Sequence, residues 1–264
     1  ASDVYKRQAK RFGMEEFHEE RQENRSEFQR DYDRLIFSAP FRRLQNKTQV
    51  FPLPGSVFVH NRLTHSLEVA SVGRSLGDDV AKALLERHPE LQDSFLPEIG
   101  SIVSAACLAH DLGNPPFGHS GEKAISTFFS EGKGVRLKEK QPNGEQHSPM
   151  EWEDLTHFEG NANAFRILTH QFEGRRKGGF VLTYTTLASI VKYPFSSSLA
   201  GTKSKFGFFV SEEESFQKIA TELGLTLLNE HPLKYARHPL VYLVEAADDI
   251  CYQMMDIEDA YKPV

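Results

Sequence analysis

An apolar run that ends in a histidine–aspartate pair limits how this chain can fold. Residues 101–109 read SIVSAACLA, and His110 and Asp111 follow directly. Gly113 and the pair Pro115–Pro116 come next, and residues of these types end helices. Neighbouring residues on a regular helix point about 100° apart, so both side chains reach one ion only at a helix end. The run therefore predicts a helix from about Ile99 to Asp111 with a polar site at its end.

Two distant segments supply further side chains of the kind that bind metals. His65 lies in HNRLTHSLE, and Asp248 lies in the otherwise apolar stretch YLVEAADDICY, with Asp249 as the alternative. A carboxylate in an apolar helix needs a cation or a hydrogen-bond partner. Two imidazoles and two carboxylates suit Mn²⁺, Fe²⁺, Co²⁺, Ni²⁺ or Zn²⁺, and carboxylates also admit Mg²⁺. Metal-assisted hydrolysis is therefore the leading hypothesis, although a single His–Asp pair is usually coincidence.

Composition limits the classes of function. Hydrophobic residues make up 39% of 264 residues, which allows a sizeable core without disulfides. The net charge of −6 opposes a dedicated nucleic-acid binder. The two cysteines, Cys107 and Cys251, lie in apolar stretches and are expected to be buried thiols in a reducing compartment. Because no apolar run reaches about 18 residues, we expect a cytoplasmic protein without membrane partners.

The chain is expected to be mainly α, with a minor β-hairpin. Residues 1–8 (including SDVYKRQ) are interpreted as a non-native leader, and residues 9–264 as a single helical domain truncated at its C-terminus. Residues 9–34 are expected to form a helical arm on the surface, 35–60 a loop with a short strand or hairpin, and 132–150 an exposed excursion. Segments 178–184 and 203–210 are candidate paired strands. Helices are predicted at about 62–84, capped by Asn61, and at 99–111, 120–132, 159–172, 183–192, 211–223 with a Ser211–Glu214 capping box, and 239–257.

A second pair of polar residues follows the first within GHSGE. His119 and Glu122 are three residues apart, so they share one face if a helix has begun there. A glutamate that orients a histidine makes it a general acid or base. The alternative is that Glu122 only complements the dipole of a helix N-terminus.

Helical spacing adds candidates for substrate contacts. Arg62 precedes His65 by three residues and can approach a metal-bound phosphate. Asp248, Tyr252 and Asp256 are spaced i, i+4 and i+8, which places them on one stripe of the last predicted helix. The same spacing also fits an ordinary amphipathic helix with a tyrosine at the edge of the core.

Longer strings make the chain resemble a known family. They closely resemble the deoxyguanosine triphosphate triphosphohydrolase (dGTPase) family of the HD-domain metal phosphohydrolase superfamily, over about residues 25–262. The resemblance implies a helical HD-domain fold, one divalent metal ion, and hydrolysis of a dNTP to deoxynucleoside and tripolyphosphate. The strings are RSEFQRDYDRLIFSAPFRRLQNKTQVFP, HNRLTHSLEV, LAHDLGNPPFGHSGE, HFEGNANAFRIL and YLVEAADDICY.

The resemblance also implies a role for each matching position. It makes His119 and Glu122 the catalytic pair, and it favours Asp248 over Asp249 as the ligand because Asp248 follows the Ala–Ala pair. Mn²⁺ or Mg²⁺ is the expected ion. The implied metal ligands are His65, His110, Asp111 and Asp248. The implied substrate contacts are Lys192, Tyr193 and Lys205 at the triphosphate, Tyr252 and Asp256 at the sugar, Gln49 on the sugar and base side, and Asn161, which alternatively caps a helix. Both lysines fit solvated surface charges equally, and Lys192 also fits a charge that complements a helix C-terminus.

The family's tendency to form hexamers further suggests a homo-oligomer, whose size stays open, and single-stranded DNA is a candidate effector. Two other hypotheses stay open. One is a different HD phosphohydrolase, such as a nucleoside monophosphatase or an alarmone hydrolase. The other is a module that binds nucleotides or single-stranded nucleic acid without catalysis, against which the intact His119 and Glu122 argue.

Overall fold

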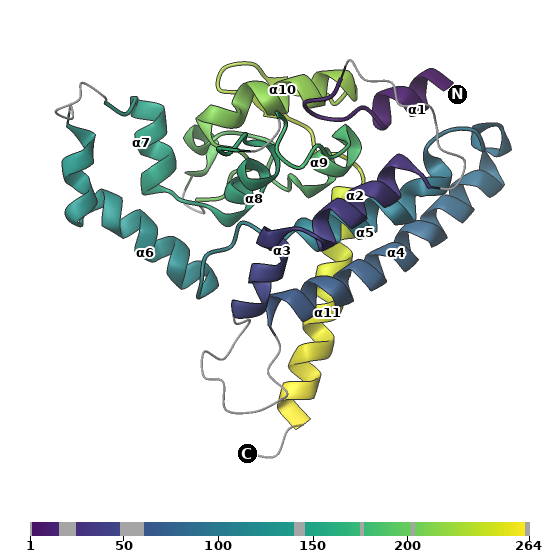
Figure 1. The fold of residues 1–264 in the computed structure, drawn as a ribbon, viewed down its shortest axis with the longest axis horizontal. Helices are drawn as coiled ribbons and strands as arrows, with labels where there is room; N and C mark the ends of the chain where they lie inside the picture. Colours follow the sequence, from purple (N-terminus) through teal and green to yellow (C-terminus); the bar gives the residue numbers. More distant parts are fainter. Residues whose placement is uncertain are drawn as a thin grey trace.

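The chain is mainly helical, as its sequence predicts. The computed structural model describes residues 2–15, 25–47, 61–139, 146–174, 177–201 and 204–261. Within these ranges α4, α5 and α11 pack against one another, α2 and α9 pack against α5, and α6 and α7 lie apart at the left of the view (Figure 1). The α-helices are α1 Ser2–Gln8, α2 Glu27–Ile36, α3 Ala39–Arg43, α4 Arg62–Arg87, α5 Ile99–Ala109, α6 Gly118–Ser130, α7 Pro149–Thr156, α8 Gly160–Thr169, α9 Tyr184–Ile190, α10 Glu213–Glu222 and α11 Val241–Tyr261. Short 3-10 helices are η1 Leu44–Asn46, η2 Pro89–Leu91, η3 Leu96–Glu98, η4 Lys133–Lys138, η5 Ser197–Leu199 and η7 Val210–Glu212.

Helices α4 and α5 form the most extensive helix pair of the described chain. Asn61 caps α4 as predicted, because its side-chain oxygen accepts hydrogen bonds from the N–H groups of Leu63 and Thr64, both at 3.0 Å. Every residue of α5 is buried. Small residues allow the two helices to approach closely, since a Cβ at Gly77 would lie 2.7 Å from the Cα of Gly100. The apolar run before the His–Asp pair is therefore a core helix.

Helix α2 shows that part of the predicted surface arm lies in the core. Phe28, Asp31 and Leu35 are fully buried, and α2 packs against α5. Asp31 accepts hydrogen bonds from Arg11 at 2.8 Å and from the Thr183 hydroxyl at 2.6 Å. The expectation of a surface arm is wrong for residues 25–34, because these paired charges enter the interior together.

The predicted pairing of segments 178–184 and 203–210 is also wrong in the described residues. The described chain forms two strands, β1 Leu227–Asn229 and β2 Lys234–Tyr235, which pair antiparallel. The apolar residues near 206 instead pack as an aromatic group, in which the rings of Phe208 and Phe216 stack at 4.9 Å between centroids. Their burial reflects helix packing rather than a sheet face.

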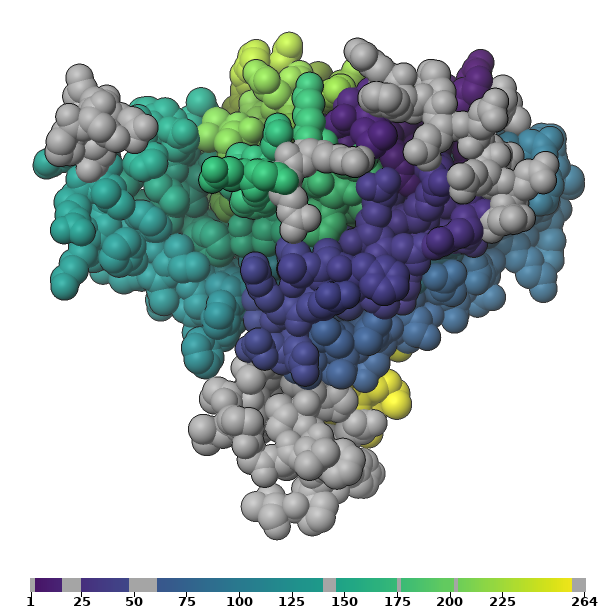
Figure 2. All heavy atoms as spheres, viewed as in Figure 1, coloured from purple at the N-terminus to yellow at the C-terminus, as the bar shows by residue number. Residues whose placement is uncertain are grey.

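Of three further predictions, two for loops and one for a helix cap, only the exposed excursion is confirmed in the described residues. The described part of 35–60 contains α3 and η1 rather than a strand, and residues 48–60, including Gln49, lie outside the described residues. Residues 132–139 are mostly exposed, as expected for an excursion, and they connect to the projecting α6–α7 region (Figure 2). The Ser211–Glu214 capping box does not form, because Glu212 is the N-cap of α10 and the Ser211 hydroxyl donates to Glu212 at 2.8 Å.

None of the described helices has the length and apolar character needed to span a bilayer.

His238 fixes the start of α11 through a neutral imidazole. Its Nδ1 accepts a hydrogen bond from the N–H of Leu240 at 3.2 Å, and the Ser189 hydroxyl lies 3.5 Å from the same atom. Burial lowers the pKa of His238 from 6.5 to about 4. The unfolded chain therefore binds a proton between these pH values while the folded chain does not, so stability falls as pH drops through this range.

We expect the His238→Gln variant to lose less stability in acid than the wild type. The wild type should lose about 2 kcal/mol through this group alone between pH 8 and pH 5. A glutamine carbonyl can still accept the Leu240 N–H but does not titrate. Urea unfolding of both proteins at both pH values measures the difference. Equal losses in the two proteins would contradict a neutral, buried His238.

Candidate active site

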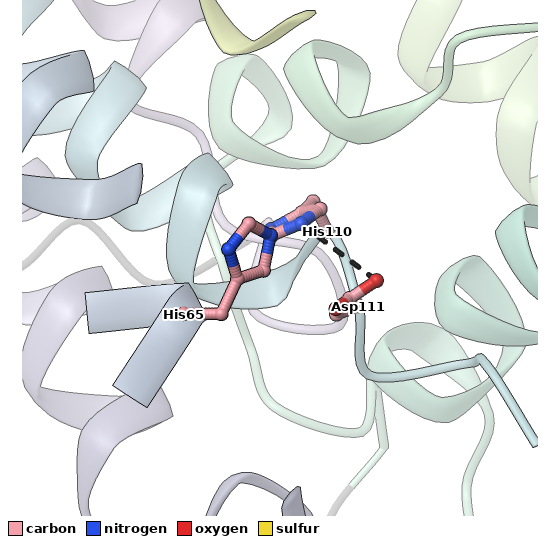
Figure 3. Close-up of side chains that lie close together, drawn as sticks. All are labelled: His65, His110 and Asp111. Carbon is pink, nitrogen blue, oxygen red and sulfur yellow. Dashed lines mark ion pairs between the residues drawn. The ribbon is translucent and has the colours of Figure 1, made fainter. Parts of the chain in front are cut away.

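Two histidines and an aspartate converge where α4 begins and α5 ends. His65 lies in the first turn of α4, His110 follows the last residue of α5, and Asp111 comes next. One potential ligand atom from each of the three lies within 4.8 Å of the others. Figure 3 shows the two rings and the carboxylate facing one another. The end of the core helix thus presents both members of the His–Asp pair to His65.

Asp248 of α11 joins this group. Its Oδ1 lies 3.0 Å from Nε2 of His65 and 3.5 Å from Nε2 of His110. The adjacent Asp249 is exposed. The spacing of Asp248 and Tyr252 places both on one stripe of α11, and the Tyr252 ring lies 4.8 Å from the His65 ring between centroids. The structure therefore brings together the four predicted ligands.

The donor atoms suit a cation. Nδ1 of His110 donates to the carbonyl oxygen of Cys107 at 2.6 Å, which leaves Nε2 as the atom directed at the carboxylates. Nε2 is buried and makes no hydrogen bond in the described chain. Burial lowers the pKa of His110, but Asp111 and Asp248 outweigh burial and raise it to about 9. Burial raises the pKa of Asp248, but the close approach of the His110 and His65 imidazoles, at 3.5 Å and 3.0 Å, holds it well below its usual range. This concentration of negative charge would favour a divalent ion in place of a proton.

Neighbouring groups hold Asp111 in place. Its Oδ2 accepts a hydrogen bond from Arg62 at 2.7 Å, and its Oδ1 accepts one from the Asn114 amide at 2.5 Å. Arg62 is only 6% exposed, and its Nε has no hydrogen-bond partner in the described chain. Lys47 donates to the carbonyl oxygens of Leu112 at 3.4 Å and Asn114 at 2.7 Å. Arg62 therefore lies beside the four predicted ligands, as its spacing to His65 suggested. Lys47 and Asn114 also hold this part of the site in place, and the sequence did not indicate either of them.

A left-handed turn connects this group to the second predicted pair. Phe117 has φ 67° and Gly118 has φ 52°, and α6 begins there. Nδ1 of His119 lies 2.8 Å from Oε2 of Glu122, whose Oε1 accepts the backbone N–H of Gly160 at 2.8 Å. Burial raises the pKa of Glu122, but its hydrogen bonds with His119 and Gly160 lower it overall. The predicted pair therefore exists, with the His119 side chain 84% exposed.

Lys205 belongs to the same network as Glu122. Its Nζ lies 2.7 Å from Oε1 of Glu159 and 3.6 Å from Oε2 of Glu122. Glu159 is 1% exposed and caps α8, because its carboxylate accepts the N–H groups of Asn161 and Ala162. The Asn161 amide also donates to Glu159 at 2.8 Å, so Asn161 does not itself cap the helix. Glu159 was not predicted, because glutamate is not among the residues preferred at a helix N-cap and the sequence therefore gives little signal for it.

Lys192 and Tyr193 belong to a third group, centred on Glu245. Oε1 of Glu245 lies 2.7 Å from Nζ of Lys192, and Oε2 accepts a hydrogen bond from Nη1 of Arg237 at 3.0 Å. Burial lowers the pKa of Lys192, but Glu245 outweighs burial and raises it. Neither Glu245 nor Arg237 was predicted, because their pairing depends on the path of the segment between β2 and α11, in which Arg237 lies. Asp256 lies one turn beyond Tyr252 and is exposed.

Comparisons with known proteins agree with this geometry. The HD-domain family matches residues 62–193. A Pseudomonas aeruginosa protein named "Deoxyguanosinetriphosphate triphosphohydrolase-like protein" is 49% identical over 243 residues, which cover 89% of this chain and 52% of that protein. A Synechocystis protein of the same name is 45% identical over 261 residues, covering 96% and 58%. A Yersinia enterocolitica protein named "Deoxyguanosinetriphosphate triphosphohydrolase" is 36% identical over 282 residues, covering 94% and 52%. The chain spans about half the length of the curated relatives it matches.

Proposed function

This chain belongs to the HD-domain family, and from that premise we propose that it is a metal-dependent deoxynucleoside triphosphate triphosphohydrolase. The relatives are phosphohydrolases by name, and the match to them covers most of the chain. The observation that carries the proposal is the convergence of His65, His110, Asp111 and Asp248. These residues would hold one divalent ion, with Mn²⁺ or Mg²⁺ as the expected species.

Three cations around this group support a triphosphate substrate. Each is paired with a carboxylate, namely Arg62 with Asp111, Lys192 with Glu245, and Lys205 with Glu159. Pairing keeps long basic side chains ordered before a ligand arrives, and phosphate oxygens can then take over part of the interaction. A nucleoside monophosphatase would have less use for three such groups, which makes it the weaker alternative.

The proposed reaction places water on the α-phosphorus and breaks the bond from that phosphorus to the nucleoside 5′-oxygen. The products are a deoxynucleoside, which takes a proton on the 5′-oxygen, and tripolyphosphate. A divalent ion would polarise the α-phosphate and lower the pKa of water. Glu122 holds Nδ1 of His119, so the other ring nitrogen is available to protonate the 5′-oxygen or to align the water.

Tyr252 supplies a reason for a preference for 2′-deoxy substrates. Its ring lies against His65 and is 37% exposed, so a sugar held near the ion would meet it. A tyrosine ring beside C2′ leaves no space for a hydroxyl, and an unpaired buried hydroxyl costs about 1–3 kcal/mol. Asp256, one turn further along α11, is proposed to contact the 3′-hydroxyl. Assembly into a homo-oligomer and an effect of single-stranded DNA stay predictions.

The identity of the phosphate product tests the proposal. The full-length protein that contains this sequence is incubated with each of the four dNTPs and with GTP, in Mn²⁺ or Mg²⁺. We expect tripolyphosphate as the first phosphate product by ³¹P NMR, with at least about fivefold lower turnover of the ribonucleotide. Release of orthophosphate or pyrophosphate as the first product would instead identify another kind of phosphohydrolase.

A further inference from the structure

Arg237 is a cation near the site that the proposed reaction does not yet use, and it is held between aromatic rings and a carboxylate. Its guanidinium lies 5.6 Å from the Tyr193 ring centroid and 5.7 Å from that of Tyr242. Two aromatic faces and Glu245 together restrict its orientation. A side chain held in this way loses little further entropy when it binds an anion, which distinguishes it from an ordinary surface arginine.

Most of the hydrogen-bonding capacity of Arg237 is unused. A guanidinium has five N–H donors. Within the described ranges, only Nη1 has an acceptor, Oε2 of Glu245, while Nε and Nη2 have none. The side chain is 31% exposed, so a ligand can reach these donors. The arrangement leaves a fork of N–H groups available for phosphate oxygens.

Charge balance at Glu245 also favours an anion. One carboxylate faces two cations, Lys192 and Arg237, so the group carries a net positive charge. Glu245 precedes Asp248 by three residues, which corresponds to about 4.5 Å along the helix axis, and the two lie on the same side of α11. Moving along α11 from Asp248 towards its N-terminus, a ligand therefore meets the Lys192–Glu245–Arg237 group within one helical turn.

We propose that Arg237 binds the phosphate group farthest from the nucleoside and so makes the site sensitive to the length of the phosphate chain. This inference rests on the proposed function, because it assumes that the α-phosphate lies at the four-ligand group. Lys192, which pairs with the same Glu245 carboxylate as Arg237, then contacts the middle phosphate group of the triphosphate. A diphosphate would reach Lys192 but not Arg237.

Direct binding of inorganic polyphosphates tests this role without turnover. Isothermal titration calorimetry with tripolyphosphate and with pyrophosphate is carried out on the wild type and on Arg237→Gln and Arg237→Lys variants, in the presence of Mn²⁺. We expect Arg237→Gln to weaken tripolyphosphate binding about 10- to 100-fold, the usual effect of losing a charged hydrogen bond, and to change pyrophosphate binding less than about twofold. Arg237→Lys keeps the charge but loses the fork, and it should show an intermediate loss for tripolyphosphate.

Lys234→Gln is the matched control, because Lys234 of β2 lies close to Arg237 in the sequence, has its Nζ 5.5 Å from the Phe195 ring centroid, and has no ion pair in the described chain. It should bind both anions like the wild type. An equal loss for both anions in Arg237→Gln would show a structural or general electrostatic role and overturn the proposal, as would no loss for either. The two proposals can fail separately. If Arg237→Gln selectively weakened tripolyphosphate binding but the enzyme released a first product other than tripolyphosphate, the proposed reaction would be refuted and the role of Arg237 supported.

Discussion

We expect the Asp111→Ala variant to lose divalent-metal binding by more than about 100-fold. Partners that only orient metal ligands contribute about 10- to 100-fold in affinity, and a carboxylate that contacts the ion contributes more. Asp111 lies next to His110 and within reach of His65, in the only three-residue group of possible ligands found in the described chain. Titration with Mn²⁺ followed by calorimetry, and elemental analysis of the purified protein, measure the effect.

Removal of Asp111 also leaves the buried Arg62 without its carboxylate, which can destabilise a fold by about 3–5 kcal/mol. The His110→Gln variant avoids this problem because it keeps the Arg62–Asp111 pair while removing an imidazole ligand. Asp249→Ala is the matched control on α11, and it should retain the ion, whereas Asp248→Ala should not. Full metal occupancy in both Asp111→Ala and His110→Gln would rule out the proposed centre, and loss of metal in Asp249→Ala alone would reassign the fourth ligand.

The second large effect is expected at His119. Replacement with alanine should lower kcat by about 10²- to 10⁴-fold, the usual contribution of a general acid or base. The structural basis is the 2.8 Å contact between Nδ1 of His119 and Glu122, together with the exposure of the ring. Because His119 is not among the four ligands, metal affinity should stay within about twofold of the wild type. Steady-state kinetics and metal titration on the same preparation separate these two quantities.

His88→Ala is a control for the loss of a surface histidine paired with a glutamate. His88 lies 3.3 Å from Glu90 at the end of α4, and both side chains are more than half exposed. Its removal should leave turnover unchanged. If His119→Ala lost the ion as well as activity, His119 would be a ligand or a structural residue rather than an acid or base.

The parts of the fold that sequence predicts well depend on local signals. The Asn61 cap and the apolar spacing after it locate α4, and the apolar run with the Gly113–Pro115 break locates the end of α5. The errors come from segments whose environment is set by distant residues. Asp31 is polar in the sequence but enters the core because Arg11 and Thr183 meet it there. The pattern around Phe208 resembles a strand, yet its burial comes from Phe216 of α10.

The candidate site shows the same division. Spacing on one helix indicates that Asp248 and Tyr252 share a stripe, and it indicates that His119 and Glu122 can meet. It cannot indicate that Lys205 meets Glu159, because the two lie in different segments joined only in the folded chain. The sequence therefore indicates the side chains of the candidate site itself, but it does not indicate most of the residues that orient them.

The wide separation of the ligands along the chain has a consequence for the order of events during synthesis. His65 and Asp248 are 183 residues apart, yet their side chains touch. Chains emerge from the ribosome N-terminal end first, and folding proceeds in that direction. α4 and α5 can pair while α11 is still in the exit tunnel, so a growing chain has both histidines and Asp111 before it has the last carboxylate. Metal affinity should therefore rise only when α11 docks onto α4 and α5, and the nascent protein should not act on nucleotides before that step.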